Sequence, residues 1–235
     1  MPNLASADFQ NPLLWALLIG WIISVILHEF AHGLVAHLGG DYTIRERGGL
    51  SLNPIQYVDP VFSLIIPAVI LLMGGIPLPG GVTYIRRDLL RSRNWDTAVS
   101  LAGPAMNIVL FLACAIPLHP RIGWINPAVD VAQWSNVQVF LAAMAILQLT
   151  AAVLNLIPVP PLDGFQALGN YLPPQIRDKV GNPPVSTFAF FVYFMILWNG
   201  GFGRILLHVF LPTMQLLGFD NATIIKVVTA WGRVF

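Results

Sequence analysis

Apolar stretches long enough to cross a lipid bilayer dominate this sequence, and they limit its fold more than any other feature. Residues 13–38, 97–118 and 137–157 each form one such stretch. A hydrocarbon core of about 30 Å takes about 20 residues of helix to cross. The Asn11-Pro12 pair favours a helix start, because Asn caps helices and Pro suits their first turn. We therefore predict an all-α polytopic membrane protein.

Charged residues are too scarce to cover a soluble surface. They make up 10% of the 235 residues, whereas a soluble domain carries about 25%. This scarcity argues against a soluble enzyme, a disordered chain and a nucleic-acid-binding protein. The formal net charge of +1 gives no reason to expect a polyanionic partner. The expected surroundings are the lipid bilayer, and no nucleic acid partner is expected.

Shorter apolar runs raise the expected number of membrane segments to about five or six. Residues 61–78 contain Pro67 and end in a turn rich in Gly and Pro, so they form either a short span or a re-entrant segment. Residues 186–198 and 205–219 are separated by an Asn-Gly-Gly-Phe-Gly sequence. They form either two short spans or one broken hairpin.

The polar connections are too short for a second soluble domain. Residues 41–59 have β-like character, and the tail from Asp220 is typical of an interfacial segment. We therefore predict that residues 1–235 form a single integral-membrane domain. Its core is expected over 13–169, and its C-terminal membrane segments and interfacial tail over 186–235.

The distribution of basic residues predicts how the chain is oriented. A re-entrant segment at 61–78 places ten of the twelve Lys and Arg residues on one side of the membrane, whereas a true span divides them less cleanly. The positive-inside rule thus favours the re-entrant segment, with the N-terminus outside and the C-terminus in the cytoplasm. The ten residues expected on the cytoplasmic side are Arg45, Arg47, Arg86, Arg87, Arg91, Arg93, Arg177, Lys179, Lys226 and Arg233.

The first apolar stretch contains the sequence His-Glu-Phe-Ala-His at residues 28–32. On a helix, His28 and His32 lie one turn apart on the same face, so both imidazoles can reach one metal ion. Glu29 lies beside them, where it can take a proton from a metal-bound water. A pair of helix-packing histidines is the alternative, but it leaves a costly glutamate inside an apolar span.

A catalytic zinc site needs a third protein ligand and an open position for water. Asp163 is the best candidate, because it follows the third apolar stretch in a proline-broken sequence. Irregular backbone at membrane depth is tolerated only where it is buried in protein or lines a wet cavity. Taken alone, Asp163 could equally be a solvated turn residue before Gly164.

Three motifs together resemble the site-2 protease family of intramembrane zinc metalloproteases. They are HEFAH in the first stretch, AGPAMN at residues 102–107, and NLIPVPPLDG at residues 155–164. Their order and spacing fit the family, and the resemblance covers roughly residues 23–169. It implies proteolysis within the membrane, with an active site near the cytoplasmic face.

The resemblance also implies individual roles. His28, His32 and Asp163 would hold one zinc ion per chain, with Glu29 as the general base. Asn155 would bind substrate backbone or steady the oxyanion. The AGPxxN segment would pack beside the metal-binding helix, which singles out Gly103, Pro104 and Asn107, and we include Asn107 among the catalytic candidates.

The stretch GGLSLNPIQYVDP resembles a compact bacterial subgroup of this family. That subgroup commonly has a His two residues before the Asp-Pro pair, where this chain has Tyr57, so an extra metal ligand or a supporting role for this loop stays open. The length leaves no room for a PDZ or other regulatory domain. The expected location is the bacterial cytoplasmic membrane.

The sequence thus predicts a protease that hydrolyses peptide bonds in or near transmembrane segments of membrane proteins. We expect the substrate helix to unwind by pairing with an exposed strand edge near residues 45–53 or with the re-entrant segment. A metal-binding scaffold without protease activity is the alternative, although a scaffold has no need of Glu29. A transporter is less favoured, because the charged residues cluster at one site and do not line a path. The sequence carries no signature of an oligomeric state.

Overall fold

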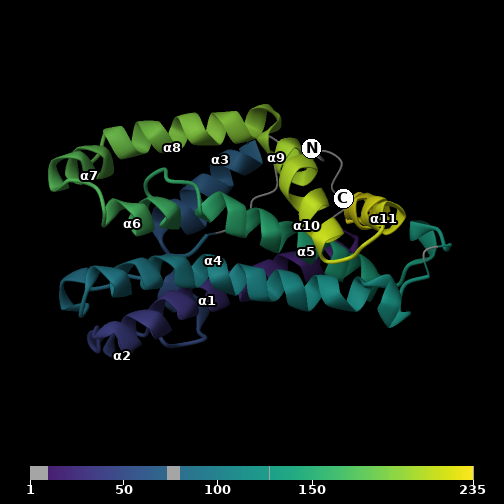
Figure 1. Cartoon of the computed structure of the whole chain (residues 1–235), viewed down its shortest axis with the longest axis horizontal. Helices are drawn as coiled ribbons and strands as arrows, with labels where there is room; N and C mark the ends of the chain where they lie inside the picture. Colours follow the sequence, from purple (N-terminus) through teal and green to yellow (C-terminus); the bar gives the residue numbers. More distant parts are fainter. Residues whose placement is uncertain (1–9, 73–79, 127, 235) are drawn as a thin grey trace.

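The computed structural model describes residues 10–72, 80–126 and 128–234, and within them every regular element is helical (Figure 1). This confirms the all-α prediction. The elements are α1 (Pro12–Gly39), α2 (Thr43–Glu46), α3 (Ile66–Leu72), α4 (Arg93–Ala115), α5 (Asn136–Asn155), α6 (Asp163–Gly169), α7 (Pro174–Gly181), α8 (Val185–Ile196), α9 (Phe202–Ile205), α10 (Leu211–Leu216) and α11 (Asn221–Trp231).

The long helices α1, α4 and α5 pack together and form the centre of the molecule (Figure 1). Their ends follow from local chemistry. The side chain of Asn11 accepts a hydrogen bond from the backbone N–H of Leu13 at the start of α1. Gly40, with φ of 122°, ends that helix in a conformation that other residues rarely adopt. Ser135 and Gln138 form a capping box at the start of α5.

Among the described residues, three helical stretches are long and apolar enough to cross a membrane: Pro12–Gly39, Arg93–Leu118 and Asn136–Asn155. A fourth crossing is possible if Val185–Ile196 and Asn199–Leu216, which are bent by 66°, form one span. Many side chains on the outside of α1 and α8 are large, apolar and exposed, as contact with lipid requires. The finer count of about five or six membrane segments stays a prediction.

The segment expected to be re-entrant lies only partly within the described residues. The chain makes a π-helical turn over Pro60–Ile65 and continues as α3. Residues 73–79, which include the predicted Gly/Pro turn, lie outside the described residues. The re-entrant path therefore stays a prediction.

The β-like character expected for residues 41–59 is wrong. This stretch contains α2 and a 3₁₀ turn over Pro54–Tyr57, and no strand. The buried phenol of Tyr57 donates a hydrogen bond to the backbone carbonyl of Ser51 at 2.6 Å, which folds the stretch back on itself. The backbone carbonyl of Gly49 lies so close to α1 that a Cβ atom on Gly33 would approach it to 2.0 Å. Compact packing on α1 thus replaces an exposed strand edge.

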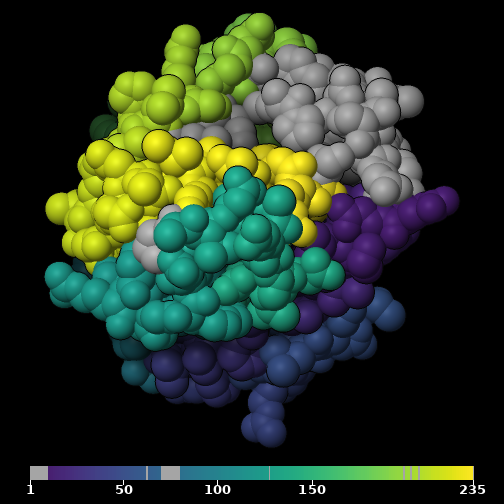
Figure 2. All heavy atoms as spheres, turned by 90° about the vertical axis from the view of Figure 1, so that its right-hand side faces the viewer, coloured from purple at the N-terminus to yellow at the C-terminus, as the bar shows by residue number. Residues whose placement is uncertain are grey.

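The two ends of the described chain meet at one end of the bundle, opposite α2 and α7 (Figures 1 and 2). The side-chain amide of Asn11 donates to the backbone carbonyls of Arg233 and Val234 at 3.0 and 3.2 Å. Helix α11 packs its apolar face against α5. Arg233 also donates to carbonyls of the loop that joins α4 and α5.

In this arrangement Asn11 and the last described residues lie at the same end of the bundle, whereas the sequence interpretation placed the N-terminus outside and the C-terminus in the cytoplasm. The orientation of the chain in the membrane stays a prediction. The break at Asn199 and Gly200 bends the chain by 66° and does not reverse it, so the path from α8 to α10 returns to the end where α1 begins. Lys226 and Arg233 consequently lie at that end, whereas the sequence interpretation placed them with the other basic residues.

Candidate metal centre

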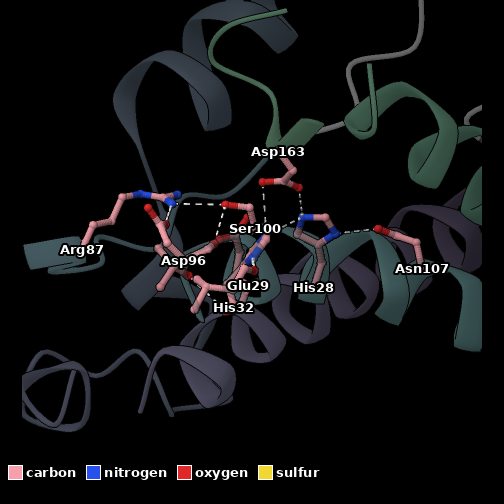
Figure 3. A network of polar contacts seen from close by, with 10 residues as sticks. His28, Glu29, His32, Arg87, Asp96, Ser100, Asn107 and Asp163 are labelled. Atoms are coloured by element: carbon pink, nitrogen blue, oxygen red, sulfur yellow. Dashed lines mark hydrogen bonds and ion pairs between the residues drawn. The ribbon is translucent and has the colours of Figure 1, made fainter. Parts of the chain in front are cut away.

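Helix α1 places His28 and His32 one turn apart on the face that packs against α4. Both residues are buried, and their Nε2 atoms are 3.1 Å apart. The spacing of four residues puts both rings on one side of the helix, as expected from the sequence. Figure 3 shows the two imidazoles turned toward the same point.

Asp163 brings the third candidate ligand to this point from α6 (Figure 3). It is the first residue of that short helix, directly after the proline-broken turn that follows α5. One carboxylate oxygen lies 3.2 Å from His28 Nε2, and the other lies 3.4 Å from His32 Nε2. Candidate ligand atoms of the three residues all lie within 4.8 Å of one another.

The donor set suits a metal cation. The Nδ1 atom of His32 lies 2.7 Å from the backbone carbonyl of Val99. A carbonyl only accepts, so Nδ1 carries a proton, and the ring in its neutral form presents a lone pair at Nε2. Asp163 Oδ2 is buried without a hydrogen-bond partner in the described part of the chain. Lone pairs facing one another across 3 to 4 Å are stabilised by a cation between them, and His nitrogen and Asp oxygen are zinc ligands.

Glu29 lies beside this cluster and faces a cavity of about 370 Å³. Glu29 is 6% exposed, and His28, His32 and Asp163 also line the cavity. Gly81 passes so close that a Cβ atom on it would lie 3.0 Å from Glu29 Cγ. Glu29 therefore lines the same cavity as the candidate ligands, with Gly81 packed against its side chain.

The segment 80–87 forms one wall of the cavity, and sequence reasoning did not assign it a role. Its backbone is held at three points. Ser63 donates to Gly80 O at 2.7 Å, Val82 N donates to the backbone carbonyl of Tyr57 at 3.0 Å, and Arg86 N donates to Asp41 at 2.8 Å. The only hint in the sequence is a lone aspartate, Asp41, after the Gly pair that ends the first helix.

Arg87 lies at the rim of the same cavity. The sequence analysis used this residue only to predict the orientation of the chain in the membrane. Its guanidinium pairs with the carboxylate of Asp96 and donates to Ser100 Oγ at 3.1 Å (Figure 3). Both partners lie on the first turns of α4 and are buried. This pair fastens the end of the 80–87 segment to the helix that contacts the histidines.

The two asparagines predicted as catalytic lie in different surroundings. Asn155, at the end of α5, is half-buried and lines the cavity, and its side chain makes no hydrogen bond to the described part of the chain. Asn107 is buried on α4 with its Oδ1 atom 2.5 Å from His28 Nδ1, so it contacts the histidine on the side away from Asp163 (Figure 3).

Tyr57 lies outside the ligand cluster. Its hydroxyl group is used within its own loop, where it donates to Ser51 O at 2.6 Å. Burial, together with the charge of Glu29, raises the pKa of Tyr57 to about 12, so the phenol keeps its proton. The residue thus stabilises the 41–59 loop, and nothing in its contacts gives it a metal-binding role.

The AGPAMN segment packs against α1, with Gly103, Pro104 and Asn107 all buried on α4. The close approach depends on Gly103. A Cβ atom at this position would lie 2.3 Å from His32 Nε2 and 2.4 Å from His28 Nε2. Only glycine leaves both nitrogen atoms accessible to a third partner.

Replacing Gly103 by Ala should therefore weaken metal binding, because the added methyl group occupies the space at both Nε2 atoms. We expect the dissociation constant for Zn²⁺, measured by chelator competition on purified protein, to rise by more than about 10-fold. Gly203→Ala is the matched comparison, because Gly203 is also helical and its Cβ position has open space around it. Unchanged zinc affinity in Gly103→Ala would contradict the assignment of this space to the metal.

Comparisons with known proteins agree with this geometry. The sequence profile described as "Peptidase family M50" matches residues 120–199. A protein of Mycolicibacterium smegmatis named "Putative zinc metalloprotease Rip2" is 38% identical over 85% of this chain and 74% of its own length. A Mycobacterium tuberculosis protein of the same name is 36% identical over 87% of this chain and 78% of its own length.

A more distant similarity reaches Bacillus subtilis. Its protein YwhC, named in the same way as a zinc metalloprotease, is 29% identical over 77% of this chain and 78% of its own length. No solved structure matches the chain.

Proposed function

Because this chain belongs to peptidase family M50, the site-2 proteases, and is a zinc metalloprotease of the membrane, we propose that His28, His32 and Asp163 hold its zinc ion. We propose further that Glu29 is the general base, and that the protein cleaves peptide bonds in or near transmembrane segments of its substrates. The observation that carries the proposal is the convergence of the three ligand atoms beside Glu29, at one wall of a cavity.

The chemistry divides between the metal and the chain. When bound to three protein ligands, zinc would act as a Lewis acid and would lower the pKa of a coordinated water to about 7. Glu29 accepts a proton from the attacking water on its carboxylate and passes it to the nitrogen of the leaving amine. The side-chain amide of Asn155 donates a hydrogen bond to the carbonyl oxygen of the scissile bond as charge develops there.

Substrate access is proposed along the 80–87 segment. The expectation of a strand edge at residues 45–53 is overturned by the helical loop found there. The 80–87 segment instead presents irregular backbone directly to the cavity, at Gly81, Val82 and Thr83. A substrate helix that has unwound locally can exchange its own backbone hydrogen bonds for bonds to such a segment.

The proposed orientation places the catalytic end of the bundle toward the cytoplasm of a bacterial cell, with the N-terminus outside. It is supported by the basic residues, of which eight lie in the segments around α2, α7 and the start of α4, at the catalytic end (Figure 1). They are Arg45, Arg47, Arg86, Arg87, Arg91, Arg93, Arg177 and Lys179. We propose that residues 13–169 and the helices that follow act as one membrane domain.

Removal of the metal tests the proposal directly. Purified protein in detergent, stripped with a chelator, should lose cleavage of a model transmembrane substrate, and stoichiometric Zn²⁺ should restore it. The melting temperature should fall on stripping, because zinc at 100 times its dissociation constant stabilises the folded state by about 2.7 kcal/mol. Cleavage that persists in protein shown to be free of metal would refute the zinc mechanism.

A further inference from the structure

A chain of buried polar side chains runs from His28 into the centre of the helix bundle. His28 Nδ1 lies 2.5 Å from Asn107 Oδ1, Asn107 Nδ2 lies 2.7 Å from Gln148 Oε1, and Gln148 Nε2 lies 2.6 Å from Ser24 Oγ. Ser24 Oγ in turn lies 2.8 Å from the backbone carbonyl of Gly20. This series of side chains connects α1, α4 and α5, and Gln148 at its middle is 0% exposed.

The direction of these hydrogen bonds follows from the last acceptor. The carbonyl of Gly20 can only accept, so the hydroxyl group of Ser24 must supply the hydrogen between the two oxygen atoms. The oxygen of Ser24 is then free to accept, and the amide nitrogen of Gln148 donates to it. The partners of the Gln148 side chain thus fix the orientation of its amide group.

The same logic continues to the metal ligand. With its nitrogen turned to Ser24, Gln148 presents its oxygen to the amide nitrogen of Asn107. Asn107 therefore presents its own oxygen to His28, and that oxygen accepts the proton of Nδ1. A neutral His28 that donates from Nδ1 carries its lone pair on Nε2, the atom that faces Asp163.

A backbone carbonyl thus orients each histidine, directly for His32 and through three side chains for His28. His32 donates directly to the backbone carbonyl of Val99. His28 has no carbonyl in that position, and its partner is an amide that could present either oxygen or nitrogen. We propose that Gln148 is a positioning residue for His28. Its amide, held in one orientation by Ser24 and the Gly20 carbonyl, orients Asn107 and so keeps His28 in the tautomer that is protonated at Nδ1 and can bind a metal through Nε2. This inference rests on the zinc site proposed above.

The test compares three variants on α5. Gln148→Met keeps the length of the side chain and removes both hydrogen bonds. Gln148→Glu keeps an oxygen that accepts from Asn107 in either protonation state, so the polarity survives. Thr150→Val is the matched control, because Thr150 is buried two residues away and its hydroxyl has no hydrogen-bond partner in the described part of the chain.

The first measurement is the dissociation constant for Zn²⁺ alone, by chelator competition on the purified full chain. Gln148→Met should raise it by about 10- to 100-fold, the usual effect of losing a group that orients a metal ligand. Gln148→Glu and Thr150→Val should both stay within about three-fold of the unmodified protein, as variants that keep the ligand oriented. A role in packing alone predicts instead that Met and Glu have similar effects.

The second measurement reads the tautomer in metal-free protein from the ¹⁵N chemical shifts of the imidazoles. The chain has five histidines, so the assignment is tractable with single variants. His28 should be protonated at Nδ1 in the unmodified protein and in Gln148→Glu. In Gln148→Met it should be a mixture of the Nδ1- and Nε2-protonated tautomers. If Gln148→Met does not fold, Ser24→Ala removes the anchor at the other end and should give the same mixture.

The outcomes separate this inference from the proposed function. If Gln148→Met keeps either the zinc affinity or the Nδ1 proton of His28, or if Gln148→Glu loses zinc as severely as Gln148→Met does, the proposed role of Gln148 is refuted. His32→Ala tests the metal site itself. If His32→Ala binds zinc as the unmodified protein does, the proposed zinc site is refuted. If His32→Ala loses zinc but Gln148→Met binds it normally, only the proposed role of Gln148 is refuted.

Discussion

Glu29→Gln is expected to bind zinc normally and to cleave a transmembrane substrate about 10²- to 10⁴-fold more slowly than the unmodified protein, the range over which a general acid–base group contributes. The amide has the shape of the carboxylate but cannot accept a proton. Glu29 is not one of the three converging ligands, so the metal site should be unaffected. The measurement is the initial rate of cleavage in detergent or liposomes, at a zinc content determined for each preparation.

The matched control for this variant is Glu46→Gln. Glu46 is the second of only two glutamates in the chain, and it is exposed on the short helix α2. Its neutralisation removes the same charge without touching the cavity, so the cleavage rate should not change. A zinc-loaded Glu29→Gln protein that cleaves as fast as the Glu46→Gln protein would show that another group is the base.

Asp163→Ala is expected to lose zinc. Only His28 and His32 remain as ligands in this variant, and their Nε2 atoms cannot provide the third protein bond of a catalytic zinc site. Loss of a direct ligand should cost more than the roughly 10- to 100-fold in affinity that outer-shell changes cost. Metal analysis after dialysis against a weak chelator should give a zinc content near one per chain for the unmodified protein and near zero for the variant.

Asp178→Ala serves as the control for the loss of a carboxylate. Asp178 lies exposed on α7, in the same connection between α5 and α8 as Asp163. It should retain full zinc content. If Asp163→Ala also retains full zinc content after the same dialysis, the third ligand lies elsewhere, and the close contacts of Asp163 with the histidines are an ion-pair arrangement without a metal.

Much of the site could be predicted from the sequence because its signals are local. The spacing of His28 and His32 fixes their common face on any helix, and the Asn-Pro pair and the Gly pair set the bounds of that helix within one residue. The predicted spans match α1, α4 and α5 for the same reason: each is long, apolar and limited by residues that cap or break helices.

The connections were predicted less well because their structure depends on distant partners. Residues 41–59 were expected to have β-like character, but packing of Gly49 against Gly33 and the inward turn of Tyr57 make the stretch compact. Likewise, the composition of residues 186–219 shows that the helix is broken but not the angle of the break. That angle decided on which side of the bundle the C-terminus lies.

The sequence alone determined that this protein lies in a membrane, that it is helical, and that two histidines and a glutamate share the first span, because charge content and helical periodicity are properties of the chain itself. Only the tertiary structure decided which groups surround them. The contact of Asp163 with both histidines, the wall formed by residues 80–87 and the path from His28 to Gln148 each join residues dozens of positions apart. No local pattern encodes such contacts, since they arise when α1, α4 and α5 pack and their few buried polar groups must find partners.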